Sequence, residues 1–123
     1  MHGFIFDFGG TLDRLPDPVG FLKALRVKHP EAKIFLYTGT QVSAIDAAYP
    51  GLLGLVDAWV AKPEVLKPLL RTLGFPLTSV VYSDDDAFLS KAMVRMFRPV
   101  PCELVLPQDL LRLIEPTCET PSS

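Results

Sequence analysis

The segment FIFDFGGTLD, residues 4–13, decides how this chain is expected to fold. It begins with three large apolar residues, which is typical of a buried β-strand. The carboxylate of Asp7 follows this apolar run directly, and two glycines stand close behind it. Burying a charge without partners is costly, so an acid at this point needs partners or a ligand. Because glycine lets the backbone turn sharply and approach a ligand, the segment predicts a strand that ends at a binding site.

Outward from this segment, short apolar runs alternate with helical patterns along the chain. The runs expected to form strands are 3–8, 33–38, 55–60, 79–83 and 101–106. The segments expected to form helices are 18–29, 42–48, 63–73, 87–96 and 108–114. Such an alternation indicates βαβ units with helices on both faces of a parallel sheet. We therefore predict an α/β fold, a Rossmann-like three-layer α/β/α sandwich with a central, mainly parallel five-stranded sheet.

Length and composition favour one small domain that contacts neither membranes nor nucleic acids. The chain has 123 residues and a net charge of −2, and 49% of its residues are hydrophobic, which is enough for an ordinary core. We expect a single domain over 1–115 and a flexible tail over 116–123. No apolar run of roughly 20 residues and no secretory leader is present, so a cytoplasmic protein is expected. The absence of a Lys/Arg-rich stripe argues against nucleic-acid binding.

Polar residues stand at the carboxyl ends of four predicted strands. Asp7 follows the first strand, Thr38 ends the second, Lys62 follows the third, and the acidic run 84–86 follows the fourth. In an open parallel sheet the ligand crevice lies beyond these strand ends. A nucleophilic carboxylate, a hydroxyl, an ammonium group and an acidic cluster are the groups needed for phosphoryl transfer through an aspartyl-phosphate. Mg²⁺ suits such a site because it binds one or two carboxylates and keeps several waters.

These strand ends resemble the four motifs of the haloacid dehalogenase-like (HAD) superfamily, most of whose members are Mg²⁺-dependent phosphatases. FIFDFGGTLD is similar to the first motif, an Asp-x-Asp-Gly-Thr-Leu run after an apolar strand. IFLYTGT (34–40) is similar to the second motif, AKP (61–63) to the third and SVVYSDDD (79–86) to the fourth. The resemblance covers about residues 3–106. It implies a phosphoric monoester hydrolase whose substrate is a phosphorylated small molecule or macromolecule.

Carried over by position, the resemblance implies a nucleophile and a magnesium site. Asp7 would attack the phosphorus atom and would share Mg²⁺ with Asp84. The remaining protein ligand would be the backbone carbonyl of Gly9. Asp85 would support the metal without binding it directly, either by orienting these ligands or through a water.

The same resemblance assigns the contacts to the substrate's phosphate. Thr38 and the amide of Gly39 would hold phosphate oxygens, and Lys62 would neutralise charge between the nucleophile and the phosphate. Gly10 and Thr11, in the turn after the nucleophile, would lie close to the phosphate.

Position 9 departs from the pattern that the resemblance implies. Phosphatases of the superfamily usually keep a second Asp there as the general acid, and this chain has Gly9. Because general acid–base catalysis contributes roughly 10²- to 10⁴-fold, we expect a slow phosphatase, or a degraded member that binds a phosphorylated ligand or a protein partner. The spacing of the motifs leaves no room for a cap domain. Uncapped relatives tend to act on bulky or macromolecular phosphates, or shield the site by forming homo-oligomers.

Other interpretations of the same residues remain open. Residues 84–86 suit the start of a helix, with Asp86 as its N-cap, and Lys62 could be an ordinary solvated lysine. A receiver-like signalling domain is also an α/β protein phosphorylated on Asp, but it would need an acidic pair after the first strand and a Lys after the fifth, which this sequence lacks. Trp59 and the phenylalanines are expected in the core, and Asp57 is expected to pair with a neighbouring element.

Overall fold

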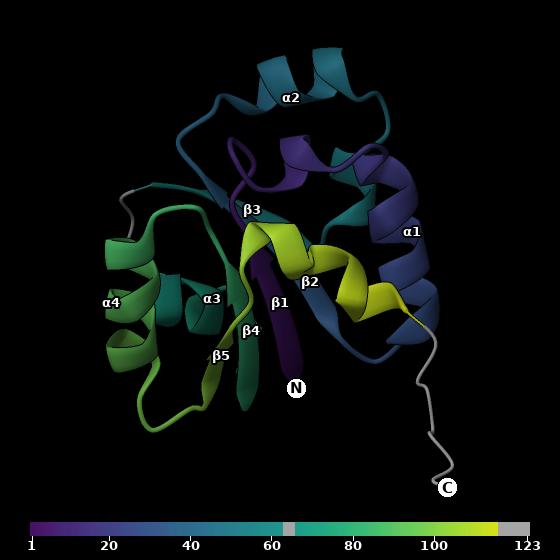
Figure 1. Cartoon of the computed structure of the whole chain (residues 1–123). Helices are drawn as coiled ribbons and strands as arrows, with labels where there is room; N and C mark the ends of the chain where they lie inside the picture. Colours follow the sequence, from purple (N-terminus) through teal and green to yellow (C-terminus); the bar gives the residue numbers. More distant parts are fainter. Residues whose placement is uncertain (63–65, 116–123) are drawn as a thin grey trace, which may run out of the picture.

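A five-stranded, fully parallel sheet forms the centre of the molecule (Figure 1). The computed structural model describes residues 1–62 and 66–115. The strands are β1 (His2–Phe6), β2 (Lys33–Thr38), β3 (Ala58–Ala61), β4 (Ser79–Ser83) and β5 (Cys102–Leu104). They lie in the order β3-β2-β1-β4-β5, so β1 is the central strand.

Helices cover both faces of this sheet and so complete three layers (Figure 1). The α-helices are α1 (Pro18–Lys28), α2 (Val42–Ala48), α3 (Leu66–Thr72) and α4 (Ala87–Phe97). The 3-10 helices are η1 (Leu12–Arg14), η2 (Leu53–Leu55) and η3 (Pro107–Ile114). Apolar side chains of α1, α2 and the 3-10 helices pack on one face of the sheet, and those of α3 and α4 pack on the other.

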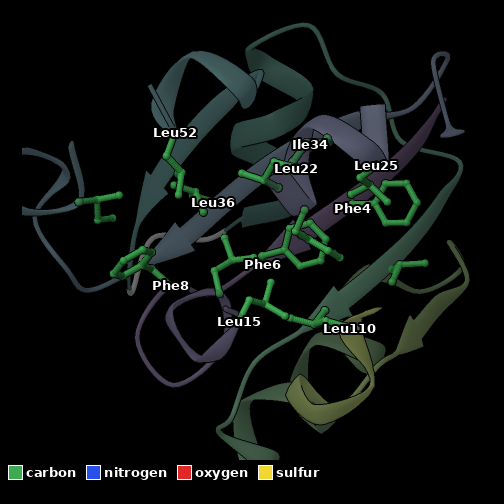
Figure 2. Packing of buried hydrophobic residues seen from close by; sticks show 14 of the residues in the cluster. Phe4, Phe6, Phe8, Leu15, Leu22, Leu25, Ile34, Leu36, Leu52 and Leu110 are labelled. Carbon is green, nitrogen blue, oxygen red and sulfur yellow. The ribbon is translucent and has the colours of Figure 1, made fainter. Parts of the chain in front are cut away.

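Alternate residues of each strand point to opposite faces and fill two separate cores. On β1, Phe4 and Phe6 pack toward α1, whereas Ile5 packs toward α3 and α4. Figure 2 shows the first of these cores, where side chains from β1, β2 and α1 meet. Because both faces of the sheet are covered, the strands read in the sequence as continuous apolar runs.

The order of the strands places a topological switch point between β1 and β4. From β1 the chain adds β2 and then β3 on one side, and it then crosses to the other side to add β4 and β5. In doubly wound sheets, ligands bind beyond the carboxyl ends of the strands at such a point. The order also differs from the flavodoxin-like 2-1-3-4-5 order. The topology therefore argues against a receiver-like domain, which has the flavodoxin-like order.

The predicted α/β sandwich with five parallel strands is confirmed, and the first and fifth strands, predicted over 3–8 and 101–106, are shorter, His2–Phe6 and Cys102–Leu104. The third strand begins at Ala58 and not at Leu55, which lies in η2. Asp57 accounts for this: its amide donates to the Ile34 carbonyl at 2.7 Å, while its own carboxylate accepts from the Ile34 amide at 2.8 Å. A side chain thus replaces the backbone acceptor at this point of the sheet. The last helix, predicted over 108–114, is the 3-10 helix η3.

Some expectations from the sequence fall differently or lie outside the described residues. The start of the predicted helix 63–73 and the predicted tail 116–123 fall on residues 63–65 and 116–123, which the structure does not describe. Trp59 and Phe88 were expected in the core, but they are 48% and 82% exposed. Trp59 lies on an edge strand and is covered in part, whereas Phe88 lies on the outer face of a helix. None of the described helices combines the length and apolarity needed to cross a bilayer.

Candidate functional site

Asp7 lies at the switch point, directly after the central strand. Its backbone amide donates to the Ser83 carbonyl at 3.0 Å, which continues the pairing of β1 with β4 by one residue. The chain then turns away, and this turn is anchored by the buried side chains of Phe8 and Leu12. The Asp7 side chain is 8% exposed, so its carboxylate is held in a largely buried position above the sheet.

Lys62 joins Asp7 to Asp84 across the ends of three strands. Its Nζ lies 2.6 Å from Asp84 Oδ2 and 3.3 Å from Asp7 Oδ1. The Lys62 amide donates to the Thr38 carbonyl at 3.1 Å, which fixes the start of this segment against β2. Residues widely separated in sequence thus form one cluster of a lysine and two carboxylates at the carboxyl ends of the strands. The Lys62 side chain is 22% exposed, so the cluster is open to solvent on the lysine side.

Asp84 is completely buried and is held by three donors. Tyr82 Oη donates to Asp84 Oδ2 at 2.8 Å, and the Asp86 amide donates to Asp84 Oδ1 at 3.0 Å. Lys62 supplies the third contact. Tyr82 lies on β4 two residues before Asp84, which directly follows the strand, so the alternation of side chains along the strand places the phenol on the side of the carboxylate. Asp86 accepts from the Leu89 amide at 3.0 Å and is the N-cap of α4, as predicted.

The two buried carboxylates differ in their ease of protonation. Burial and the neighbouring charge of Asp84 raise the pKa of Asp7 to about 6, against the lowering effect of Lys62. Burial also works to raise the pKa of Asp84, but the hydrogen bonds from Lys62, Asp86 and Tyr82 outweigh it, so this pKa is lowered. Asp84 therefore stays ionised, while Asp7 is the carboxylate that titrates near neutral pH.

The carboxylates of Asp7 and Asp84 also shift the pKa values of Lys62 and Tyr82. Burial opposes the charge of Lys62, but its hydrogen bond to Asp84 and the two nearby carboxylates raise its pKa. Burial and the charge of Asp84 raise the pKa of Tyr82. Lys62 thus remains a cation and Tyr82 a neutral donor at neutral pH.

Three carboxylates lie close enough together to hold one cation. One oxygen from each of Asp7, Asp84 and Asp85 lies within 4.8 Å of the others. Carboxylate oxygens are the ligands that Mg²⁺ prefers, and a carboxylate that already accepts two or three hydrogen bonds has lone pairs left for a metal. Asp85 is exposed, so a cation and its waters could enter from that side. The donor set therefore fits Mg²⁺, with Gly9 in the turn directly after Asp7 as the expected carbonyl ligand.

The Thr38 segment lies beside the cluster with donors of its own. The Thr38 hydroxyl accepts from the Thr40 amide at 3.0 Å, so its orientation is fixed and its own proton stays available to a phosphate oxygen. Gly39 is exposed, and a Cβ built there would meet no atom within 4 Å. The backbone at this strand end is therefore open to an incoming group.

The two glycines of the turn, Gly9 and Gly10, differ in whether the fold requires glycine at their positions. Gly10 has a φ of 77°, in the left-handed region, and a Cβ there would overlap the Asp85 carboxylate. Gly9 has no positive φ, and a Cβ built on it would meet only the Thr40 Oγ1, at an ordinary 3.7 Å. The fold thus requires glycine at position 10 but not at position 9. Thr11 is fully buried and its hydroxyl lacks a hydrogen-bond partner among the described residues, so the structure does not bring it to the surface of the cluster.

Sequence reasoning missed three residues around this cluster. Tyr82 could have been found because it stands two residues before Asp84, near the end of the predicted strand. Thr40 and Trp59 carry no such signal, because their positions depend on a turn and on the exposure of an edge strand. Asp57 pairs with Arg26 of α1, with an oxygen to nitrogen distance of 3.1 Å, as expected of a structural partner.

Comparisons of this chain with protein-family models, with curated proteins and with solved structures each gave no match. The residues of the site and their geometry therefore carry the functional conclusion.

Proposed function

We propose that this chain is a small, cap-less Mg²⁺-dependent phosphatase of the HAD-like type that acts through an aspartyl-phosphate on Asp7. The observation that carries this proposal is the cluster at the switch point. There, Lys62 bridges Asp7 and Asp84, and Asp85 brings a third carboxylate oxygen within 4.8 Å of the other two. A nucleophile, a cation and a metal-binding set therefore meet where a doubly wound sheet binds its ligands.

The environment of Asp7 suits a nucleophile. Its carboxylate is largely removed from water and its pKa is about 6, so it is mostly ionised at neutral pH but weakly solvated. The Lys62 ammonium, 3.3 Å from it, offsets the repulsion between this carboxylate and the negative phosphate of a substrate. The Thr38 hydroxyl supports a phosphate oxygen by donating its proton in a hydrogen bond.

Asp84 has a supporting role in this proposal. Its lowered pKa keeps it ionised, and its contacts with Lys62 and Tyr82 keep it in one orientation. Asp7, Asp84 and Asp85 would hold Mg²⁺, which supplies charge neutralisation of the phosphate when bound. The described connections between the strands contain no additional domain, so the cluster stays open for a bulky phosphate.

Phosphate release from phenyl phosphate, with Mg²⁺ and with a chelator, tests the proposal. We expect Mg²⁺-dependent turnover that Asp7→Asn abolishes and that Asp46→Asn, an exposed carboxylate on α2, leaves unchanged. Equal rates in the wild type and in Asp7→Asn would refute a nucleophilic role for Asp7.

A second function, phosphate-ligand binding without turnover, is favoured by Gly9. The position usually held by the general acid is empty, although the backbone would accept a side chain there. Fluoroberyllate separates the two functions when combined with kinetics, because it mimics an aspartyl-phosphate and stabilises a protein that binds it. Thermal protection that depends on Asp7 and Lys62, together with no turnover of any ester, would favour the binding protein.

A further inference from the structure

The only tryptophan of the chain is exposed beside the candidate site. Trp59 lies on β3, an edge strand, and points away from the core that its neighbour Val60 joins. It is paired in register with Leu36, two residues before Thr38 at the end of β2. Large aromatic side chains stabilise a fold mainly when they are buried, and Trp59 is 48% exposed, so about half of its surface contributes nothing to the core.

Trp59 is one of the residues that line a hollow beside the Asp7–Lys62–Asp84 cluster. The hollow has a volume of about 440 Å³ and is lined by residues 38–43 and 59–62. Its lining includes Thr38 and Lys62, the proposed phosphate contacts, so a substrate held by both would extend into it. A cavity of a few hundred Å³ is in the usual range for small ligands. Trp59 stands three residues before Lys62, about 10 Å along an extended strand, which is a suitable reach for the organic part of a phosphate ester.

The space at position 9 opens toward the same hollow. Thr40 Oγ1, 3.7 Å from the place of a Cβ at Gly9, belongs to a residue that also lines the hollow. Position 9 is where the resemblance to HAD phosphatases would place the acid that protonates the leaving group. The leaving group is therefore expected on the side of the hollow, between Gly9 and Trp59, where the described residues offer no carboxylic acid.

We propose that the substrate is an aryl phosphate monoester whose aromatic ring lies against the Trp59 indole, an inference that rests on the proposed phosphatase function. Two independent features agree on this class. An exposed indole offers a flat apolar face, which favours a planar ring over a flexible alkyl chain. The absence of an acid at Gly9 favours a leaving group that departs as an anion, and a tyrosine-like phenol has a pKa of about 10, far below that of an alkyl alcohol.

The reaction balances without an acid from the protein. An Asp7 oxygen forms a bond to phosphorus while the bond from phosphorus to the aryl oxygen breaks, and the phenolate takes its proton from water. A second water then hydrolyses the aspartyl-phosphate, which releases inorganic phosphate and restores the Asp7 carboxylate.

Fluorescence of the single tryptophan tests the contact directly. Wild-type protein with Mg²⁺ is titrated with phenylphosphonate and with propylphosphonate, which share the phosphonate group and resist hydrolysis. We expect phenylphosphonate to change the Trp59 emission and to bind about 2- to 10-fold more tightly than propylphosphonate, the range that an aromatic pair contributes. Equal affinities and an unchanged emission would overturn the inference.

Variants separate this inference from the proposed function. By calorimetry, Trp59→Leu should lose the 2- to 10-fold preference for phenylphosphonate, while Trp59→Phe, which keeps a ring, should retain most of it. Phe88→Leu removes an exposed aromatic outside the hollow and should change neither affinity. In kinetics, Trp59→Leu should raise KM for phenyl phosphate by the same factor and leave KM for propyl phosphate unchanged.

A failure of the aryl preference and a failure of the phosphatase function would give different results. Asp7-dependent hydrolysis of both esters with identical KM values in the wild type and Trp59→Leu would overturn the aryl preference and leave the phosphatase in place. No hydrolysis of either ester, with phenylphosphonate binding unaffected by Asp7→Asn, would overturn the phosphatase and with it the substrate class.

Discussion

The substitution Asp7→Asn should stabilise the metal-free protein, although it removes the proposed nucleophile. The pKa of Asp7 in the fold, about 6, is above the ordinary 3.8, so ionisation of this carboxylate destabilises the folded state. The penalty is absent below pH 3.8, grows between pH 3.8 and 6, and is complete above pH 6. A difference of about 2.2 at 1.36 kcal/mol per pKa unit gives about 3 kcal/mol, undiminished by solvent because the side chain is 8% exposed. Asparagine has the shape of the carboxyl group without its charge, so it avoids the penalty.

Urea unfolding of the wild type and Asp7→Asn, from pH 4 to pH 8 with a chelator, measures this effect. The two proteins should have nearly equal free energies of unfolding at pH 4, and Asp7→Asn should be about 3 kcal/mol more stable at pH 8. Saturating Mg²⁺ should stabilise the wild type more than the variant and so reduce or reverse the difference. Asp46→Asn, an exposed carboxylate on α2, serves as the control and should show no such trend. A difference between wild type and Asp7→Asn that stays constant from pH 4 to pH 8 would refute the electrostatic account of Asp7.

Three further predictions follow from the contacts around the cluster. Gly9→Ala should stabilise the protein by about 0.4–1 kcal/mol in urea unfolding because its φ is not positive, whereas Gly10→Ala should destabilise it by at least about 1–2 kcal/mol because its φ is 77°; equal effects would contradict the geometry. Gly9→Asp should raise the rate on alkyl phosphates by up to roughly 10²- to 10⁴-fold and that on aryl phosphates much less, as measured by phosphate release; equal gains on both would mean that the new carboxylate does not act as the acid. Tyr82→Phe removes a buried donor to Asp84 and should lower the free energy of unfolding by about 1.5–3 kcal/mol both at pH 8 and at pH 4, because the lowered pKa of Asp84 keeps this carboxylate ionised at both; an unchanged stability at both would mean that the phenol does not stabilise the charge of Asp84.

The sequence predicts the layers of this fold well because its strands are short, apolar and separated by helical patterns. Covered on both faces, the strands carry an apolar signal at every residue, and the rule for parallel sheets then places their ends together. This is why Asp7, Lys62 and Asp84 could be grouped before their distances were known. The strand order, and with it the switch point between β1 and β4, was not predicted, because no local pattern tells on which side of a central strand the chain adds the next one.

Residues whose environment depends on the edge of the sheet were predicted less well. Trp59 looks like a core residue in the sequence because it stands in an apolar run, yet its strand has a neighbour on one side only. Asp57 looks like a strand residue in the sequence. Its carboxylate accepts the hydrogen bond of the Ile34 amide in place of a backbone carbonyl, and the strand begins one residue later, at Ala58. Both environments depend on how β3 lies against β2, a segment more than twenty positions away, which local sequence patterns do not reach.

The two glycines after Asp7 show how the structure separates a requirement of the fold from one of chemistry. Gly10 is forced by its backbone conformation and by the Asp85 carboxylate against it, so its presence says nothing about catalysis. Gly9 is under neither constraint, since a side chain would fit beside the Thr40 hydroxyl. The fold therefore does not explain the missing acid, and the character of the leaving group becomes the natural explanation. An ester of an acidic phenol needs no protonation to depart, and Trp59 is among the residues that line the hollow where its ring would have to rest.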